Sequence, residues 1–142
     1  MRLQAYGTCL AAPTAADAAR GADVVVLATT STVPVLDAAT VEPGTHLTTV
    51  GPKWTGAHET PLELLRRAAV ITCDSPQQAA AYPDPFFTDP AALIPLSAVV
   101  AGEMAGRTTA ADITVHCSVG LAGTEVIIAA ALLASQETGE LR

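Results

Sequence analysis

The chain has 142 residues, of which 50% are hydrophobic and 15% charged, with a formal charge of -7 and a pI near 4.7. This composition excludes a disordered chain, which combines low hydrophobicity with high net charge. It also argues against a nucleic-acid partner, because such proteins present a basic surface to phosphates. A chain of this length buries about 70% of its unfolded surface, so we expect one domain.

The cysteines and histidines show no motif of a disulfide or metal site. No two cysteines form a C-x-x-C pair, and no two histidines have the spacing of zinc ligands. We interpret the three thiols as buried and free in a reducing cytosol. The residues concerned are Cys9, Cys73, Cys117, His46, His58 and His116.

The apolar stretches of the chain are too short for a membrane partner. Residues 1–6 lack the apolar core of a signal peptide, and the most apolar stretch, 126–134, is shorter than the roughly 20 residues that cross a bilayer. We therefore expect a cytoplasmic protein.

The chain begins with signals for a strand and a helix. Residues 8–12 are a candidate short strand. Thr14 can cap a helix together with Asp17, and Gly21 can end it in the left-handed conformation that glycine tolerates.

Two apolar runs then predict neighbouring parallel strands. Residues 24–28 form a continuous apolar run without polar alternation, which is typical of a central strand buried on both faces, and residues 46–50 form a second run that ends at Gly51-Pro52. The segment between them fits a crossover with a short helix near residues 36–41. Both runs release polar or glycine-rich loops at their carboxyl ends, where open α/β sheets bind ligands.

The middle of the chain repeats this alternation of helices and strands. A helix starts at Thr60-Pro61, with Thr60 as its cap, a buried strand follows at 69–73, and Asp74-Ser75-Pro76 starts another helix. The four prolines between residues 82 and 95 predict a surface crossing without regular structure beyond single turns, anchored by Phe86 and Phe87.

The last third predicts two helices and a strand. We expect a helix over 96–105, a fourth strand over 113–117 and a helix over 121–136. The last helix is apolar on nearly every face, so it should be buried or packed on a partner. The alternation of elements predicts an α/β fold with a doubly wound, parallel, Rossmann-like sheet and flanking helices.

Three groups of residues, in this order, resemble the ornithine cyclodeaminase and mu-crystallin family. They are 22–29; then 43–51 with Gly56 and Glu59; and 113–115 with 118–122. The resemblance runs from about residue 8 to residue 134. It implies that residues 1–142 form a single, incomplete NAD(P)-binding domain. We expect the amino-terminal dimerisation and substrate domain of the family, and the first two strands of its sheet, to be absent.

The resemblance also implies a cofactor site for NAD or NADP. Loops after the first two strands match cofactor-contacting positions of the family, and the turn after the fourth strand matches positions beside the nicotinamide and the substrate. The expected cofactor contacts are Thr29, Thr30, Val50, Gly51, Pro52 and Ser118, and the expected substrate contact is Val119. The loop hydroxyls have another possible role, which is to cap the strand end. Gly51 would let a ligand approach its backbone closely.

Lys53 stands where the family has the aspartate that acts in acid-base catalysis. A lysine with its ordinary pKa is a poor base at neutral pH, so ornithine cyclisation is doubtful. Three roles remain open for Lys53: a cation that binds a carboxylate, an amine that forms an imine with a carbonyl compound, or an exposed lysine beside Trp54.

Residues 118–123 invite comparison with a dinucleotide fingerprint, because a strand leads to G-x-x-G at a helix start. Ser118 occupies the first glycine position, and no acidic residue follows about 20 positions later. A tight strand-to-helix turn, in which glycines allow close packing, is the alternative.

If the first two strands are missing, the strand at 24–28 becomes an unpaired edge. In the usual order 3-2-1-4-5-6, residues 8–12 would be strand 3 and residues 24–28 strand 4, with the later strands of the chain following as strands 5, 6 and onward. Such an edge invites pairing with another chain, so we expect homo-oligomers through 24–28, or docking of residues 2–6 onto it.

These expectations define the functions to be tested. The first is a portion of an NAD(P)-dependent enzyme that transfers hydride at the α-carbon of an amino acid or imine and lacks activity alone. The alternatives are a mu-crystallin-like protein that binds NADP and small ligands without catalysis, and an inert truncated fragment.

Overall fold

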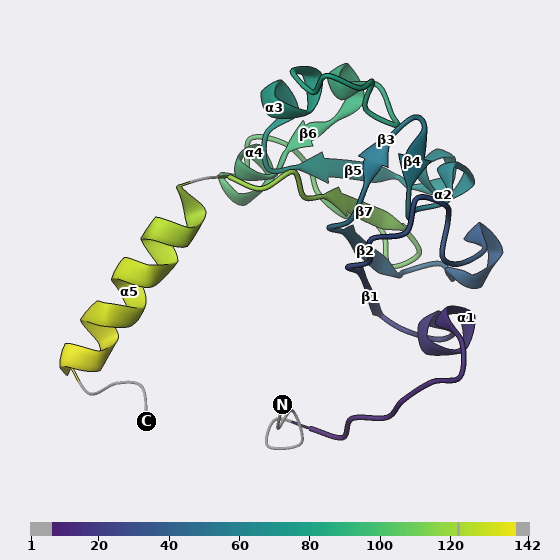
Figure 1. Ribbon diagram of the computed structural model, residues 1–142, viewed down its shortest axis with the longest axis horizontal. Coiled ribbons are helices and arrows are strands. Elements are labelled where there is room, and N and C mark those ends of the chain that lie inside the picture. Colours follow the sequence, from purple (N-terminus) through teal and green to yellow (C-terminus); the bar gives the residue numbers. More distant parts are fainter. Residues whose placement is uncertain (1–6, 122, 139–142) are drawn as a thin grey trace.

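The computed structural model describes residues 7–121 and 123–138 of the chain (Figure 1). Its centre is a parallel five-stranded sheet in the order β1-β2-β7-β5-β6, flanked by helices. The predicted α/β class with a parallel, Rossmann-like sheet is therefore confirmed. The strands are β1 (Val24–Leu27), β2 (His46–Thr49), β5 (Val70–Cys73), β6 (Ile94–Pro95) and β7 (Thr114–Cys117).

The order of the strands in the sheet departs from their order in the chain at one place. β7, the last strand in sequence, lies between β2 and β5, so these two are not neighbours. The reason is burial: Val115 and Cys117 are 1% and 0% exposed, which requires a strand on each side and a covered face.

β1 forms one edge of the sheet, as predicted. It pairs only with β2 among the described strands, and Val24 and Val26 remain 60% and 61% exposed. The expectation that residues 24–28 are buried on both faces is therefore wrong, because only Val25 and Leu27 face the core. The expected strand at 8–12 is wrong: these residues are exposed and outside any strand. No strand of the described residues lies beside them to supply ladder hydrogen bonds. Residues 2–6, the other expected partner of this edge, lie outside the described residues.

The helices on the first half of the chain begin where capping chemistry allows. Thr14 caps α1 (Ala15–Ala19) by accepting from the Asp17 amide, and Gly21 follows with φ +67°. The crossover between β1 and β2 carries the 3-10 helix η2 (Ala38–Thr40), near the expected position.

The next two helices differ at their first residues. The predicted Thr60 cap is wrong, because α2 (Leu62–Arg67) starts after Pro61, and the buried Thr60 hydroxyl has no hydrogen-bond partner within the described structure. The ring of Pro61 fixes the backbone φ angle at the start of this helix, which needs no side-chain cap to set it. α3 (Pro76–Ala80) is capped by Ser75, which accepts from the Gln78 amide.

The proline-rich crossing contains more regular structure than predicted. A 3-10 helix, η3 (Pro90–Ala92), leads into β6, which pairs with β5 and forms the other edge of the sheet. Proline is tolerated at such an edge, where its missing N–H faces no neighbour. Phe86 and Phe87 are buried, as expected, and pack edge to face with ring centroids 5.0 Å apart.

The last two helices also differ from expectation. α4 (Leu96–Val100) is shorter than the predicted helix, because the chain turns at Gly102 with φ +75°. α5 (Thr124–Thr138) leaves the sheet and points away from it (Figure 1). It is not buried against the other described residues, and Val126 and Ile127 are 69% and 71% exposed. No helix within the described ranges is long and apolar enough to span a bilayer.

Candidate functional site

Three loops leave the sheet side by side at the carboxyl ends of β1, β2 and β7. The ladder continues past the strands, since the Val50 amide donates to Leu27 O at 2.9 Å and the Ser118 amide donates to Thr49 O at 3.1 Å. The loops that begin at residues 28, 50 and 118 therefore open at one edge, which is the ligand-binding edge of open α/β sheets. The expectation that the Thr29 and Gly51 loops meet at one edge is confirmed.

A buried carboxylate joins the first two of these loops. Glu59 is 0% exposed and accepts four hydrogen bonds. Its Oε2 accepts from the amide and hydroxyl of Thr29 at 2.8 and 2.7 Å, and its Oε1 accepts from the Thr49 hydroxyl at 2.7 Å and the Gly51 amide at 2.6 Å. Burial alone would raise the pKa of Glu59, but these hydrogen bonds lower it below its ordinary value of 4.5. Glu59 is therefore ionised, and its carboxylate holds both loops in place.

Gly51 is a glycine for a different reason from the one expected. A Cβ at this position would lie 2.3 Å from Thr29 O and 2.5 Å from the Glu59 carboxyl carbon. The close approach is made by these two residues of the same chain, and it leaves no room for a side chain.

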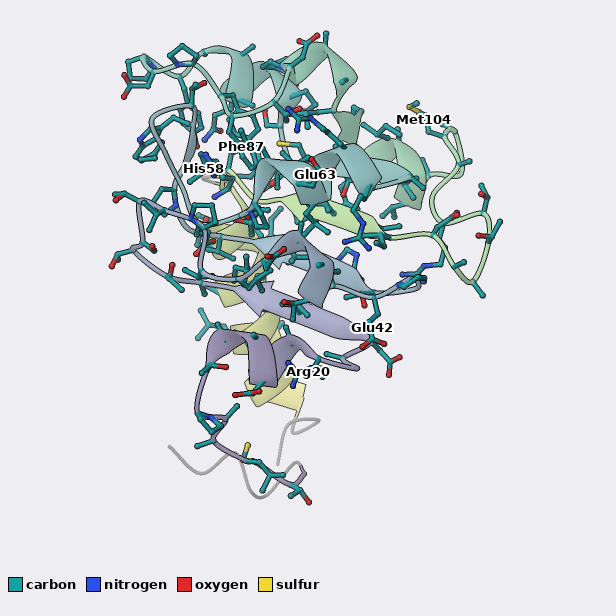
Figure 2. The ribbon with its side chains drawn as sticks, turned by 90° about the vertical axis from the view of Figure 1, so that its right-hand side faces the viewer. Arg20, Glu42, His58, Glu63, Phe87 and Met104 are labelled. Carbon is teal, nitrogen blue, oxygen red and sulfur yellow. The ribbon has the colours of Figure 1, made fainter. Side chains whose placement is uncertain are left out.

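Lys53 is buried, so its interpretation as an exposed lysine is wrong. It lies in β3 (Lys53–Trp54), which forms an antiparallel hairpin with β4 (Ala57–His58). The Phe87 amide donates to Lys53 O at 2.8 Å, and this bond holds the hairpin against the buried aromatic residues. Only 5% of Lys53 is exposed, and its Nζ donates to Gly51 O. Figure 2 shows the neighbouring His58 and Phe87 side by side, with ring centroids 6.0 Å apart.

The surroundings of Lys53 change its ionisation. Burial lowers the pKa of the Lys53 ammonium from its ordinary value of 10.5, and the nearby Cys117, Glu59 and Asp74 oppose this by favouring the charged form. The structure records no ion pair for Lys53 within the described residues.

Asp74 holds the third loop. Its carboxylate accepts from the Ser118 hydroxyl at 3.0 Å, the Val119 amide at 3.0 Å and the Gly120 amide at 2.9 Å. His116 Nε2 lies 3.5 Å from Asp74 Oδ1, and burial lowers the pKa of His116 despite this neighbour. The turn at residues 118–120 is thus built around an acidic side chain, as a strand-to-helix turn rather than a glycine loop for pyrophosphate.

These loops surround a cavity of about 490 Å³, which we call the edge cavity. It brings together six of the predicted site residues, whereas Thr29 and Thr30 do not line it. Thr29 instead lines a separate groove along β1. The lining of the edge cavity consists of Val50, Gly51, Pro52, Lys53, Trp54, Tyr82, Ser118, Val119, Gly120 and Glu125.

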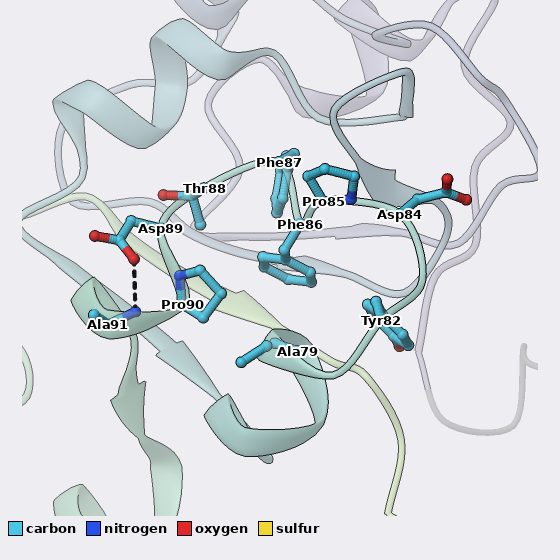
Figure 3. Close-up of a pocket in the computed structure, with 11 residues that line it drawn as sticks. Ala79, Tyr82, Asp84, Pro85, Phe86, Phe87, Thr88, Asp89, Pro90 and Ala91 are labelled. Atoms are coloured by element: carbon cyan, nitrogen blue, oxygen red, sulfur yellow. Dashed lines mark hydrogen bonds between the residues drawn. The ribbon is translucent and has the colours of Figure 1, made fainter.

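A larger cavity, of about 590 Å³, lies between α3 and the crossing at residues 82–91 (Figure 3). Its polar groups serve the local structure, for example Asp89, which accepts from the Ala91 amide at 2.9 Å. No lysine, histidine or cysteine lines it. We therefore place the candidate site at the edge cavity, which has the reactive groups.

The cysteines offer no activated nucleophile. Cys73 and Cys117 are buried register partners on β5 and β7, as the expectation of buried thiols requires. Burial raises the pKa of Cys117 to about 12 and also raises that of Cys73. The expectation was wrong for Cys9, which is exposed because residues 8–12 form no strand. No group of three or more potential metal ligands occurs among the described residues.

Comparison with known proteins agrees with this geometry. Residues 2–139 match the ornithine cyclodeaminase/mu-crystallin family. The chain belongs to this family. A Δ1-pyrroline-2-carboxylate reductase of Bacillus cereus is 29% identical over 121 residues, which are 80% of this chain and 37% of the relative.

Two solved structures of family members are also similar. The Δ1-pyrroline-2-carboxylate reductase of Thermococcus litoralis, in complex with NADH and L-proline, has a TM-score of 0.73 and 28% identity over 89% of this chain and 42% of its own. An archaeal alanine dehydrogenase dimer with bound NAD also has a TM-score of 0.73 and 28% identity, over 98% and 45% of the two chains. The chain thus spans less than half the length of these relatives. The expected cofactor type agrees with the ligands of both structures.

Sequence reasoning did not single out several residues of the site, including Glu59, Asp74 and Tyr82. Glu59 was noted only as part of the family pattern, Asp74 only as part of a helix start, and Tyr82 only as the beginning of a crossing. The signal for Asp74 was its place directly after a buried strand, at the ligand-binding edge. Nothing in the sequence indicated that Tyr82 would line the same cavity as Lys53.

Proposed function

We propose that the chain is the nicotinamide-binding portion of an NAD(P)-dependent oxidoreductase that acts on an amino acid or its imine. The observation that carries this proposal is the edge cavity, where the loops after β2 and β7 meet. When bound, the nicotinamide accepts or supplies a hydride at the substrate's α-carbon. Val50, Gly51, Pro52 and Ser118 hold the cofactor, and Val119 contacts the substrate. Thr29 and Thr30 contact the cofactor from the neighbouring loop.

The cavity fits the nicotinamide end of the cofactor better than the adenosine end. Apolar side chains such as Val50 and Val119 suit the faces of a planar ring, and a Cβ added at Gly120 would meet open space. The chain has no Gly-x-Gly-x-x-Gly fingerprint, the loop that cradles pyrophosphate in dinucleotide-binding folds. On this proposal, residues 1–142 are one incomplete cofactor domain that lacks hydride-transfer activity alone.

A binding protein without catalysis is the second candidate. It is favoured by Lys53, which stands in place of the acid-base aspartate expected from the family resemblance and is buried as a cation donor to Gly51. We place either form in the cytoplasm, with self-association through β1 as the expected oligomeric contact.

Calorimetric titration of the chain tests the location of the cofactor site. We expect heat with NADH and with reduced nicotinamide mononucleotide, and none with AMP. The V50R substitution, which fills the cavity wall with a charged side chain, should weaken binding by at least about tenfold. The matched control is V100R on α4, where valine is 81% exposed and outside the cavity. If none of the three nucleotides produces heat, the chain is an inert fragment. If V50R binds NADH as tightly as the original chain does, the cofactor site lies elsewhere.

A further inference from the structure

Lys53 is the only lysine of the chain, whose other cationic side chains are six arginines. The fold buries this lysine to 5% exposure on a two-stranded hairpin, where long charged side chains usually extend into solvent. Lys53 is also one of the residues that line the edge cavity, together with Val119 and Tyr82, and its amine donates to the carbonyl of Gly51, another lining residue. A buried amine that reaches a cavity is the arrangement by which proteins use lysine as a nucleophile.

We propose that Lys53 forms an imine with a small, uncharged aldehyde or ketone that enters the edge cavity. The neutral amine attacks the carbonyl carbon, a C–N bond forms, and the two amine protons pass to the carbonyl oxygen, which leaves as water. No oxidant or reductant is needed. The inference concerns the same cavity as the proposed function but does not require a bound nucleotide.

Several contacts prepare the amine for this step. Phe87 fixes the Lys53 backbone, and Gly51 O orients the amine through a hydrogen bond. The carboxylates of Glu59 and Asp74, which could neutralise an ammonium, are instead occupied by backbone and hydroxyl donors. Burial lowers the pKa of Lys53, so a larger fraction of its amine is neutral and nucleophilic than in an exposed lysine.

The cavity also selects the kind of carbonyl compound. Its volume of about 490 Å³ lies in the range of small-molecule sites, and its walls include the apolar surfaces of Val50, Trp54 and Val119. Glu125 lines it and Asp74 adjoins it, whereas Lys53 is the one cation among the lining residues. Because imine formation removes that cation, a carboxylate on the ligand would lose its counter-charge. An uncharged carbonyl compound therefore fits better than a 2-oxo acid.

Reductive trapping tests this inference without nucleotide. The chain is incubated with propanal and cyanoborohydride, which reduces an imine to a stable secondary amine, and peptide mass mapping compares Lys53 with the terminal α-amine as an internal standard. An exposed lysine reacts less than an α-amine at neutral pH, because its pKa is higher. We expect Lys53 to react at least about tenfold faster than the α-amine, a ratio that unfolding in urea abolishes.

Matched variants and a second probe separate the outcomes. K53R keeps a positive charge at residue 53, and K53M removes it. Both variants should lose the adduct at residue 53 and keep the α-amine adduct. Circular dichroism checks that both variants fold. Glyoxylate, an anionic aldehyde, should give a lower Lys53 to α-amine ratio than propanal. Equal labelling of Lys53 in folded and unfolded chain would overturn the inference. A higher ratio with glyoxylate would overturn the choice of an uncharged ligand. Absence of a Lys53 adduct in the original chain, together with normal NADH binding, would reject the imine and leave the proposed function intact.

Discussion

At the scale of single residues, Glu59 decides the geometry of the site. Its two oxygens each accept two hydrogen bonds, and these reach the ends of β1 and β2 from one side chain. A buried carboxylate with four donors is stable because each lone-pair direction is used. Gly51 has no Cβ because Glu59 and Thr29 occupy that space. The position of the Gly51 loop is thus set by a residue eight positions later in the chain.

The E59Q substitution should destabilise the chain by about 1–3 kcal/mol. In either orientation the new amide group faces two donors. A threonine hydroxyl can rotate to accept, but the backbone amide of Thr29 or Gly51 is left without a partner. Urea unfolding measures the loss, and E63Q on the exposed face of α2 is the control, with an expected change within about 0.5 kcal/mol.

The loss of stability caused by E59Q should depend on pH. Because the folded-state pKa of Glu59 lies below its ordinary value of 4.5, its contribution is fully present above pH 4.5 and is lost as the pH falls through the folded-state pKa. The difference in unfolding free energy between the original chain and E59Q should therefore shrink in acid. A difference that grows as the pH falls would contradict this account.

At the scale of elements, the junction between β5 and α3 positions the third loop. Asp74 follows the last residue of β5 and precedes Ser75, the cap of α3. The three hydrogen bonds that hold the turn at 118–120 therefore start from a residue anchored between a strand and a helix. The stability of this short helix start is coupled to the shape of the edge cavity.

S75A should remove the cap of α3 and cost about 0.5–2 kcal/mol. The Gln78 amide loses its acceptor, which lies at 3.2 Å in the structure. S97A, at the exposed second residue of α4, is the control, with an expected change within about 0.5 kcal/mol. Thermal unfolding followed by circular dichroism compares the two. Equal melting temperatures would show that Ser75 contributes nothing to the helix start.

At the scale of the whole molecule, two apolar surfaces lack a partner within the described chain. β1 is an unpaired edge with exposed valines, and α5 exposes Ile127 and Leu133 at 71% and 64%. Monomeric proteins rarely expose large contiguous apolar patches. These surfaces explain why we expect the chain to self-associate through β1.

V26P tests the role of the edge. His46 N and Val50 N donate to the carbonyls of Asp23 and Leu27, so the alternate residues Val24 and Val26 direct their backbone groups to the free side. Proline at 26 removes a free N–H and should shift the chain toward monomer in light scattering after gel filtration. V26T keeps the N–H and the branched shape, so it should leave the association unchanged. A chain that is monomeric without substitution would contradict the prediction.

The sequence by itself determined the fold class and the edge at which the site lies. Apolar runs that alternate with helices predict parallel strands, and such strands release their loops at a common carboxyl edge, so the loops at Thr29 and Gly51 could be placed at one edge from the sequence. The helix starts at Thr14 and Ser75 follow from capping chemistry over a few residues. These are local or strictly periodic properties, which a single chain displays directly.

Only the tertiary structure decided the strand order, the burial of Lys53 and the partners of Glu59 and Asp74. β7 takes the central place because long-range packing, rather than succession along the chain, sets the neighbours of a strand. Lys53 is buried because the hairpin docks against Phe87, far along the chain. Hydrogen bonds such as that from Val119 to Asp74 join residues 45 positions apart. No local pattern encodes these contacts, since they depend on which surfaces meet when the sheet has formed.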